Sequence, residues 1–120
     1  MREGNVIVEK SFQFSLKIIA LVSQLKQRKV EQVLLNQLLK SGTSIGANIE
    51  EAIGGSSKKD FIYKLEIAYR ESRETNYWLR LFKEGGLSEK ESTLLLLNDC
   101  DEIQKILSAI LTSSKSGTTL

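Results

Sequence analysis

The side chains that could do chemistry lie mainly in residues 70–80. Glu71 and Glu74 stand three residues apart, so a helix would place them on one face, where carboxylates can act as acid and base. The adjacent acids Glu50 and Glu51 would project about 100° apart and could not share a proton. The chain has no histidine and no serine–lysine or cysteine–histidine motif in a recognisable context. The sequence therefore predicts no catalytic residues and a protein that is not an enzyme.

The chain also has few residues of the types that bind a metal or a cofactor. Cys100 is the only cysteine, so the chain cannot form an internal disulfide, and without histidine it offers no zinc or copper site. A di-iron bundle site would need Glu-x-x-His elements, which are absent. We predict no metal, no cofactor and no small-molecule substrate. The free cysteine, together with the lack of an export signal or of a run of about 18 apolar residues, predicts a cytoplasmic protein without membrane insertion.

One helix face is typical of nucleic-acid contact. Aromatic rings and guanidinium groups alternate on it at three- and four-residue spacing, which suits base stacking and phosphate binding. The candidate nucleic-acid-binding residues are Arg70, Arg73, Tyr77 and Arg80, with Tyr63 two turns earlier. Glu66 and Glu74 each stand four residues from Arg70, and they offer an alternative in which this is an ordinary solvated or subunit face. A formal net charge of +2, from 17 basic and 15 acidic residues, does not by itself indicate a nucleic-acid binder.

The elements that must position these residues are helical. The chain has 120 residues, no proline and 41% apolar residues, which suits one all-α domain. Apolar periodicity predicts helices at about 11–27, 30–53, 58–84 and 89–111, within a single domain of residues 1–113 and followed by a disordered tail at 114–120. The third helix should bury Phe61, Leu65, Ala68, Ser72, Thr75, Leu79 and Phe82. The fourth should bury Leu96, Cys100, Ile103, Leu107 and Ile110.

Several positions predict how the helices pack. The apolar residues of the first helix cover more than one stripe, as expected of a helix buried on two sides or engaged in a subunit contact. Gly42 and Gly46 lie four residues apart in the second helix and predict a close approach of another backbone. Ser57 is predicted to cap the third helix, and Ser88 the fourth. The run Leu94–Leu97 points in all directions around its helix, so part of it must be exposed or covered by another chain.

An ordered combination of motifs resembles a known bacterial family. It comprises the run Ser41-Gly-Thr-Ser-Ile-Gly-Ala-Asn-Ile-Glu-Glu-Ala52, then Lys59-Asp-Phe61, Glu71-Ser-Arg-Glu-Thr75 and Tyr77-Trp-Leu79. This pattern resembles the four-helix-bundle proteins encoded in 23S ribosomal RNA intervening sequences. The resemblance implies an up-and-down antiparallel four-helix bundle assembled as a homopentamer. The sequence also resembles the accessory protein of diversity-generating retroelements, which works with a reverse transcriptase and its RNA.

The same resemblance implies roles for individual positions. Gly42 and Gly46 occupy the small positions of the motif, and Asn48 and Glu51 would bridge helices through side-chain hydrogen bonds. Glu71, Glu74, Tyr77 and Trp78 match the second block, and Glu71, Glu74 and Trp78 are further helix-packing or interface residues. The family offers no catalytic residues to transfer. We therefore expect an oligomeric interaction or accessory module, with RNA or a nucleic-acid-processing protein as its partner; the alternative is a protein-binding scaffold without nucleic-acid contact.

Overall fold

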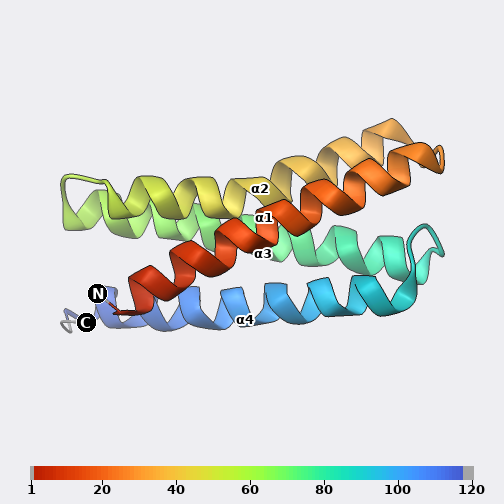
Figure 1. Ribbon diagram of the computed structural model, residues 1–120. Coiled ribbons are helices and arrows are strands. Elements are labelled where there is room, and N and C mark those ends of the chain that lie inside the picture. The colour runs from red at the N-terminus through yellow and green to blue at the C-terminus, as the bar shows by residue number, and fades with distance from the viewer. Residues whose placement is uncertain (1, 118–120) are drawn as a thin grey trace.

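The described part of the chain is a set of four long helices. A computed structural model describes the backbone of residues 2–117 and the side chains of residues 6–117. The helices are α1 (Arg2–Gln27), α2 (Gln32–Ile53), α3 (Lys58–Glu84) and α4 (Lys90–Lys115), and residues 2–117 contain no strand (Figure 1). The all-α class and the number of helices predicted from the sequence are confirmed.

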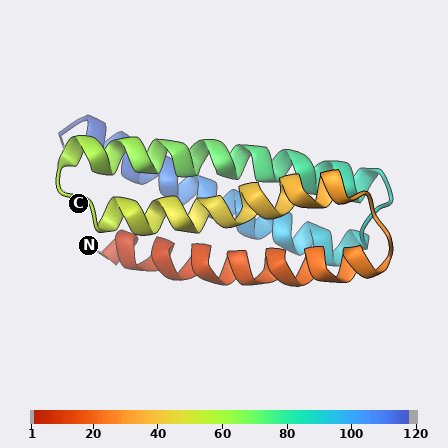
Figure 2. The same ribbon diagram turned by 90° about the horizontal axis from the view of Figure 1, so that it is seen from above.

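Successive helices run in opposite directions, so α1 begins and α4 ends at the same end of the molecule (Figure 1). α1 packs against α2 and α4, and α3 packs against the same two helices from the other side. The bundle measures 47 × 22 × 19 Å. Seen from above, α4 crosses behind α3 and α2 at an angle (Figure 2). α1 and α4 also cross at an angle, and the ion pairs of Lys10 with Glu102 and Lys17 with Asp99 join the two helices.

The core lies along the axis between the four helices and follows the predicted stripes. All five predicted α4 positions are buried, and so are the α3 positions from Leu65 to Phe82, while Phe61 is partly buried. Within the leucine run, Leu94 and Leu95 are exposed whereas Leu96 and Leu97 are buried, as the helical period requires. Because one stripe of α3 faces inward along its whole length, the opposite stripe faces solvent.

Two helix ends differ from the sequence prediction. α1 begins at Arg2 instead of near residue 11, because Ile7 is buried and Val8 packs on the core, which extends the inward face by a turn. α4 continues to Lys115 instead of ending at 111, and Ser114 is buried. The predicted disordered tail is therefore wrong for residues 114 and 115, where packing continues the helix. Residues 118–120 of that tail lie outside the described residues.

The turns are built by specific caps. Ser57 Oγ accepts a hydrogen bond from the backbone N–H of Asp60 at 3.1 Å, so the predicted N-cap of α3 is confirmed. Ser88 does not cap α4. That helix begins after Glu89, and the Ser88 hydroxyl is buried against the Thr93 hydroxyl at 2.6 Å. The preceding turn passes through Gly86 with φ +71°, a conformation that favours glycine.

The glycine-spaced segment of α2 is continuous helix. The hydroxyls of Ser41, Thr43 and Ser44 donate to carbonyl oxygens within the preceding turn, which removes their competition with the helix backbone. A Cβ atom on Gly42 would lie 2.8 Å from Ile18 Cγ2, and one on Gly46 would lie 3.3 Å from the Ser11 carbonyl oxygen. The two glycines therefore lie where α1 and α2 approach most closely.

Cys100 joins α4 to α3 in the core. Its Sγ donates to the Ser72 carbonyl oxygen at 3.2 Å, and Gln104 Nε2 donates to the same oxygen at 3.0 Å. Burial raises the pKa of the thiol from its ordinary value of 9.0 to about 12. The folded state thus holds the thiol proton more tightly than the unfolded state. The resulting stabilisation is complete below pH 9.0 and is lost as the pH rises to about 12.

This environment predicts an inert thiol. Because the thiolate is the nucleophile, we expect a chromogenic disulfide reagent to label the folded protein very slowly at neutral pH and one thiol per chain in denaturant. Absorbance of the released chromophore measures both rates. Rapid labelling without denaturant would contradict the burial of Cys100.

Candidate functional site

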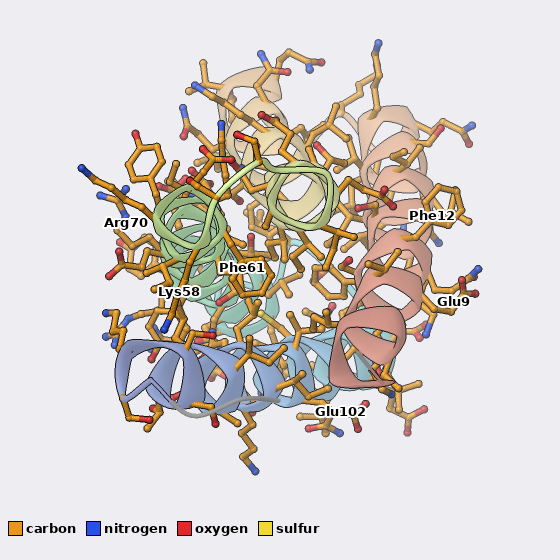
Figure 3. The ribbon with its side chains drawn as sticks, turned by 90° about the vertical axis from the view of Figure 1, so that its left-hand side faces the viewer. Glu9, Phe12, Lys58, Phe61, Arg70 and Glu102 are labelled. Atoms are coloured by element: carbon orange, nitrogen blue, oxygen red, sulfur yellow. The ribbon has the colours of Figure 1, made fainter. Side chains whose placement is uncertain are left out.

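The outward face of α3 carries the arginine and tyrosine residues that the sequence analysis singled out. It consists of Tyr63, Arg70, Arg73, Tyr77 and Arg80, all of them exposed. Arg70 and Arg80 are separated by about 15 Å along the helix axis. The Arg70 side chain points away from the bundle (Figure 3). We call this set the α3 face.

Two guanidinium groups on the α3 face have no fixed partner. Arg70 and Arg73 make no hydrogen bond and no ion pair with any residue between 6 and 117. The carboxylates expected to neutralise Arg70 are engaged elsewhere. Glu66 Oε2 accepts from Lys115 Nζ at 2.8 Å, and Glu74 Oε2 accepts from Trp78 Nε1 at 3.3 Å. The pairing of Arg70 with Glu66 or Glu74 is therefore not formed, because the longer α4 brings Lys115 to Glu66.

The other end of the α3 face is ordered. Arg80 Nε donates to Asn76 Oδ1 at 2.8 Å, and the Arg80 guanidinium carbon lies 5.9 Å from the centroid of the Tyr77 ring. The Tyr77 and Trp78 rings meet edge to face at 5.2 Å. Asn76 also donates to Asp101 Oδ1 on α4 at 3.2 Å. Arg80 is thus held in place, whereas Arg70 and Arg73 are available for an external anion.

Glu71, Glu74 and Trp78 form the inner border of this face. Glu71 is partly buried, and its pKa is raised by burial and then by Glu74, against the lowering effects of Lys40 and Arg70. Glu74 is exposed, and Trp78 packs partly buried against the core. The two carboxylates thus lie beside basic and aromatic side chains.

Asn48 and Glu51 behave differently from each other. Asn48 Nδ2 donates to the Ser44 carbonyl oxygen at 2.8 Å within α2, so the predicted bridge to another helix is not formed. The amide is one turn from that carbonyl, and this local bond satisfies it. Glu51 Oε1 accepts from Lys64 Nζ at 2.9 Å and does connect α2 with α3. That bond is the main cause of the raised pKa of Lys64.

A second surface is apolar and lies on α1. Phe12, Leu16 and Ile19 are 54%, 47% and 49% exposed, at the spacing of one helix face. They border a shallow groove of about 280 Å³ against α2, where Gly46 and Ala47 form the other wall. We call this the α1 face. Phe12 and Arg70 point outward from opposite sides of the bundle (Figure 3).

The sequence analysis missed a pocket between α3 and α4. It adjoins the α3 face, and its volume is about 610 Å³. Its walls are Tyr63, Glu66, Tyr69, Arg70, Ser108, Leu111, Thr112 and Lys115. The three-residue steps from Tyr63 to Glu66 and Tyr69 were a readable signal. The other wall comes from the end of α4, which the sequence analysis assigned partly to a tail.

Two properties of the described residues bear on other functions. Between residues 2 and 117, no helix combines the length and apolarity needed to cross a membrane. In the same part of the chain, no three His, Cys, Asp or Glu side chains gather in a way that could hold a metal ion.

Comparisons with known proteins agree on one relationship. The model of the family described as 23S rRNA-intervening sequence protein matches residues 3–109. No curated protein matches the chain significantly. A crystal structure from Bacteroides thetaiotaomicron, described as a protein with unknown function from the S23 ribosomal protein family, has a TM-score of 0.88 and 42% sequence identity, covering 92% of this chain and 98% of that one. The chain therefore belongs to the 23S rRNA-intervening sequence protein family.

Proposed function

We propose that this protein is a non-enzymatic, oligomeric interaction module of the cytoplasm that binds RNA through the α3 face. The observation that carries the proposal is the pair of exposed guanidinium groups, Arg70 and Arg73, that make no ion pair with the described residues. An exposed arginine that lacks a carboxylate partner can approach a phosphate without first breaking an internal bond. The exposed Tyr77 ring next to them offers a stacking surface for a base.

Self-assembly through the α1 face forms the second part of the proposal. Three large apolar side chains beside an apolar groove are costly to leave in water, and the occupant we assign is another copy of this chain. A ring requires two different surfaces on each copy. The exposed Leu94 and Leu95 on α4 are the complementary apolar surface that we assign to the neighbour. The homopentamer implied by the family resemblance is the assembly we expect.

The two surfaces are compatible. Because Phe12 and Arg70 point outward from opposite sides of the bundle (Figure 3), contacts on the α1 face leave the α3 face open. In a ring, each copy would present the same arginines, and an RNA that contacts several copies would gain from multivalency.

Light scattering and RNA titration test the proposal together. We expect the mass of a pentamer, a shift when structured RNA is added, and a smaller shift as salt rises. The double variant Arg70→Gln with Arg73→Gln should weaken RNA binding by about tenfold and lower the salt slope by about 2, which is about 1 for each lost phosphate contact. The matched control is Arg28→Gln with Lys29→Gln, which removes the same two charges from the exposed α1–α2 turn and should leave binding unchanged.

The outcomes separate the alternatives. A pentamer indifferent to RNA would favour the protein-binding scaffold. Equal losses in the α3 variant and in the control variant of Arg28 and Lys29 would mean that net charge, and not the α3 face, attracts RNA. A monomer that stays monomeric at high concentration would end the assembly proposal, and Phe12→Asp would then have no effect on mass.

A further inference from the structure

The pocket between α3 and α4 combines two kinds of binding group. Tyr63 and Tyr69 contribute rings from α3, and Leu111 forms an apolar floor from α4. Arg70, Ser108 and Thr112 contribute polar atoms. With a volume of about 610 Å³, the pocket falls within the usual size range of small-ligand sites.

The two rings differ in exposure. Tyr69 is partly buried and packs against the core, so its ring is a fixed wall. Tyr63 is 56% exposed, and Lys64 Nζ lies 6.0 Å from the centroid of its ring. A fixed ring and an adjustable one can accept a planar group between or against them without strain.

The polar side chains of the pocket differ in whether the protein supplies them with a partner. Arg70 and the hydroxyls of Ser108 and Thr112 make no hydrogen bond with another described residue. Lys115 is paired with Glu66, so the two opposite charges at the rim largely offset each other. The pocket therefore presents one guanidinium group that can bind an anion and two hydroxyls that can hydrogen-bond to the polar edge of a ligand. Aromatic rings lie beside these groups.

We propose that this pocket binds one nucleotide unit. The base lies against the tyrosine rings with its polar edge toward the Ser108 and Thr112 hydroxyls, and the phosphate meets Arg70. The inference rests on the proposed function and extends it, because it names the part of an RNA strand that is held and adds α4 to the contact. A free nucleoside monophosphate has the same chemistry as a nucleotide within a single strand.

The test measures both sources on the full chain. Anisotropy of a labelled short single-stranded RNA reports the strand, and tyrosine ring signals in NMR report titration with free uridine and adenosine monophosphate. Tyr63→Leu removes the stacking ring and should weaken the ligand by about tenfold. Ser108→Ala should weaken it a few-fold, whereas Ser92→Ala, the same change near the start of α4, should not. Melting curves show whether each variant is folded.

The outcomes are distinct. Loss of monophosphate binding in Tyr63→Leu supports the pocket with a free nucleotide as its ligand. Loss of strand binding alone supports it with a nucleotide inside RNA. If folded Tyr63→Leu and Ser108→Ala bind both ligands like the parent protein, the pocket proposal is overturned. In that case the RNA proposal stands provided that Arg73→Gln still weakens the strand. If no RNA binds, the proposed function falls and the monophosphate titration alone decides the pocket.

Discussion

Replacing Phe14 with alanine should lower the free energy of unfolding by about 3–5 kcal/mol. The Phe14 ring is 1% exposed in the core, where its removal leaves a cavity as well as losing apolar burial. Since a domain of this size has only about 5–15 kcal/mol in total, the variant would lose a large share of its stability. Urea denaturation followed by circular dichroism, at fixed protein concentration, measures the change.

The matched control is Phe12→Ala on the same helix. The Phe12 ring is 54% exposed, so the same truncation should lower the free energy of unfolding of a single chain by less than about 1 kcal/mol. The two variants also separate folding from assembly, because Phe12→Ala should lower the oligomer mass if the α1 face joins copies. Similar unfolding energies for both variants would contradict the inward direction of Phe14.

Gly42→Ala should destabilise the fold although alanine is the better helix former. The propensity gain is about 1 kcal/mol. Against it, the new methyl group would lie 2.8 Å from Ile18 Cγ2 and 2.9 Å from Ile18 Cγ1, an overlap that costs about 1–3 kcal/mol in a packed core. We expect a net loss of up to about 2 kcal/mol in the free energy of unfolding, measured by thermal and urea unfolding.

Two further variants make this prediction specific. Gly54→Ala places its methyl group at an ordinary 3.6 Å from the nearest carbonyl oxygen, so it should be neutral or slightly stabilising. Ile18→Ala removes Cγ1 and Cγ2, the two closest of the three Ile18 atoms that the Gly42 methyl group would meet. The double variant should therefore be less destabilised than the sum of the single ones, and strict additivity would refute direct contact.

The core of α3 and α4 could be predicted because each buried stripe repeats with the helical period over many turns. The cap at Ser57 was equally readable, since a serine three residues before an acidic residue has a local mechanism. The ends of the helices were harder to predict from the sequence. The start of α1 and the end of α4 depend on burial of Ile7 and Ser114 against other helices, which no local pattern encodes.

For the candidate site, too, the sequence predicted the local helix geometry but not the contacts between helices. Periodicity places Arg70, Arg73 and Arg80 on the outside of α3. It cannot tell which carboxylate meets which cation, because Lys115 and Glu66 are 49 residues apart in the sequence. The pocket beside Arg70 depends on that same tertiary placement. Local spacing therefore predicted which residues form the α3 face. The packing of the helices decides which partner each charged side chain on that face has.

The arrangement of the helices also bears on how the chain folds. Every pair of helices in contact is consecutive in the sequence, except α1 with α4. Such a chain closes mostly short loops and belongs to the fast-folding class of topologies. The α1–α4 seam, joined by the ion pairs of Lys10 with Glu102 and Lys17 with Asp99, requires the longest loop to close. Closure of this seam should therefore follow the pairing of consecutive helices and complete the bundle.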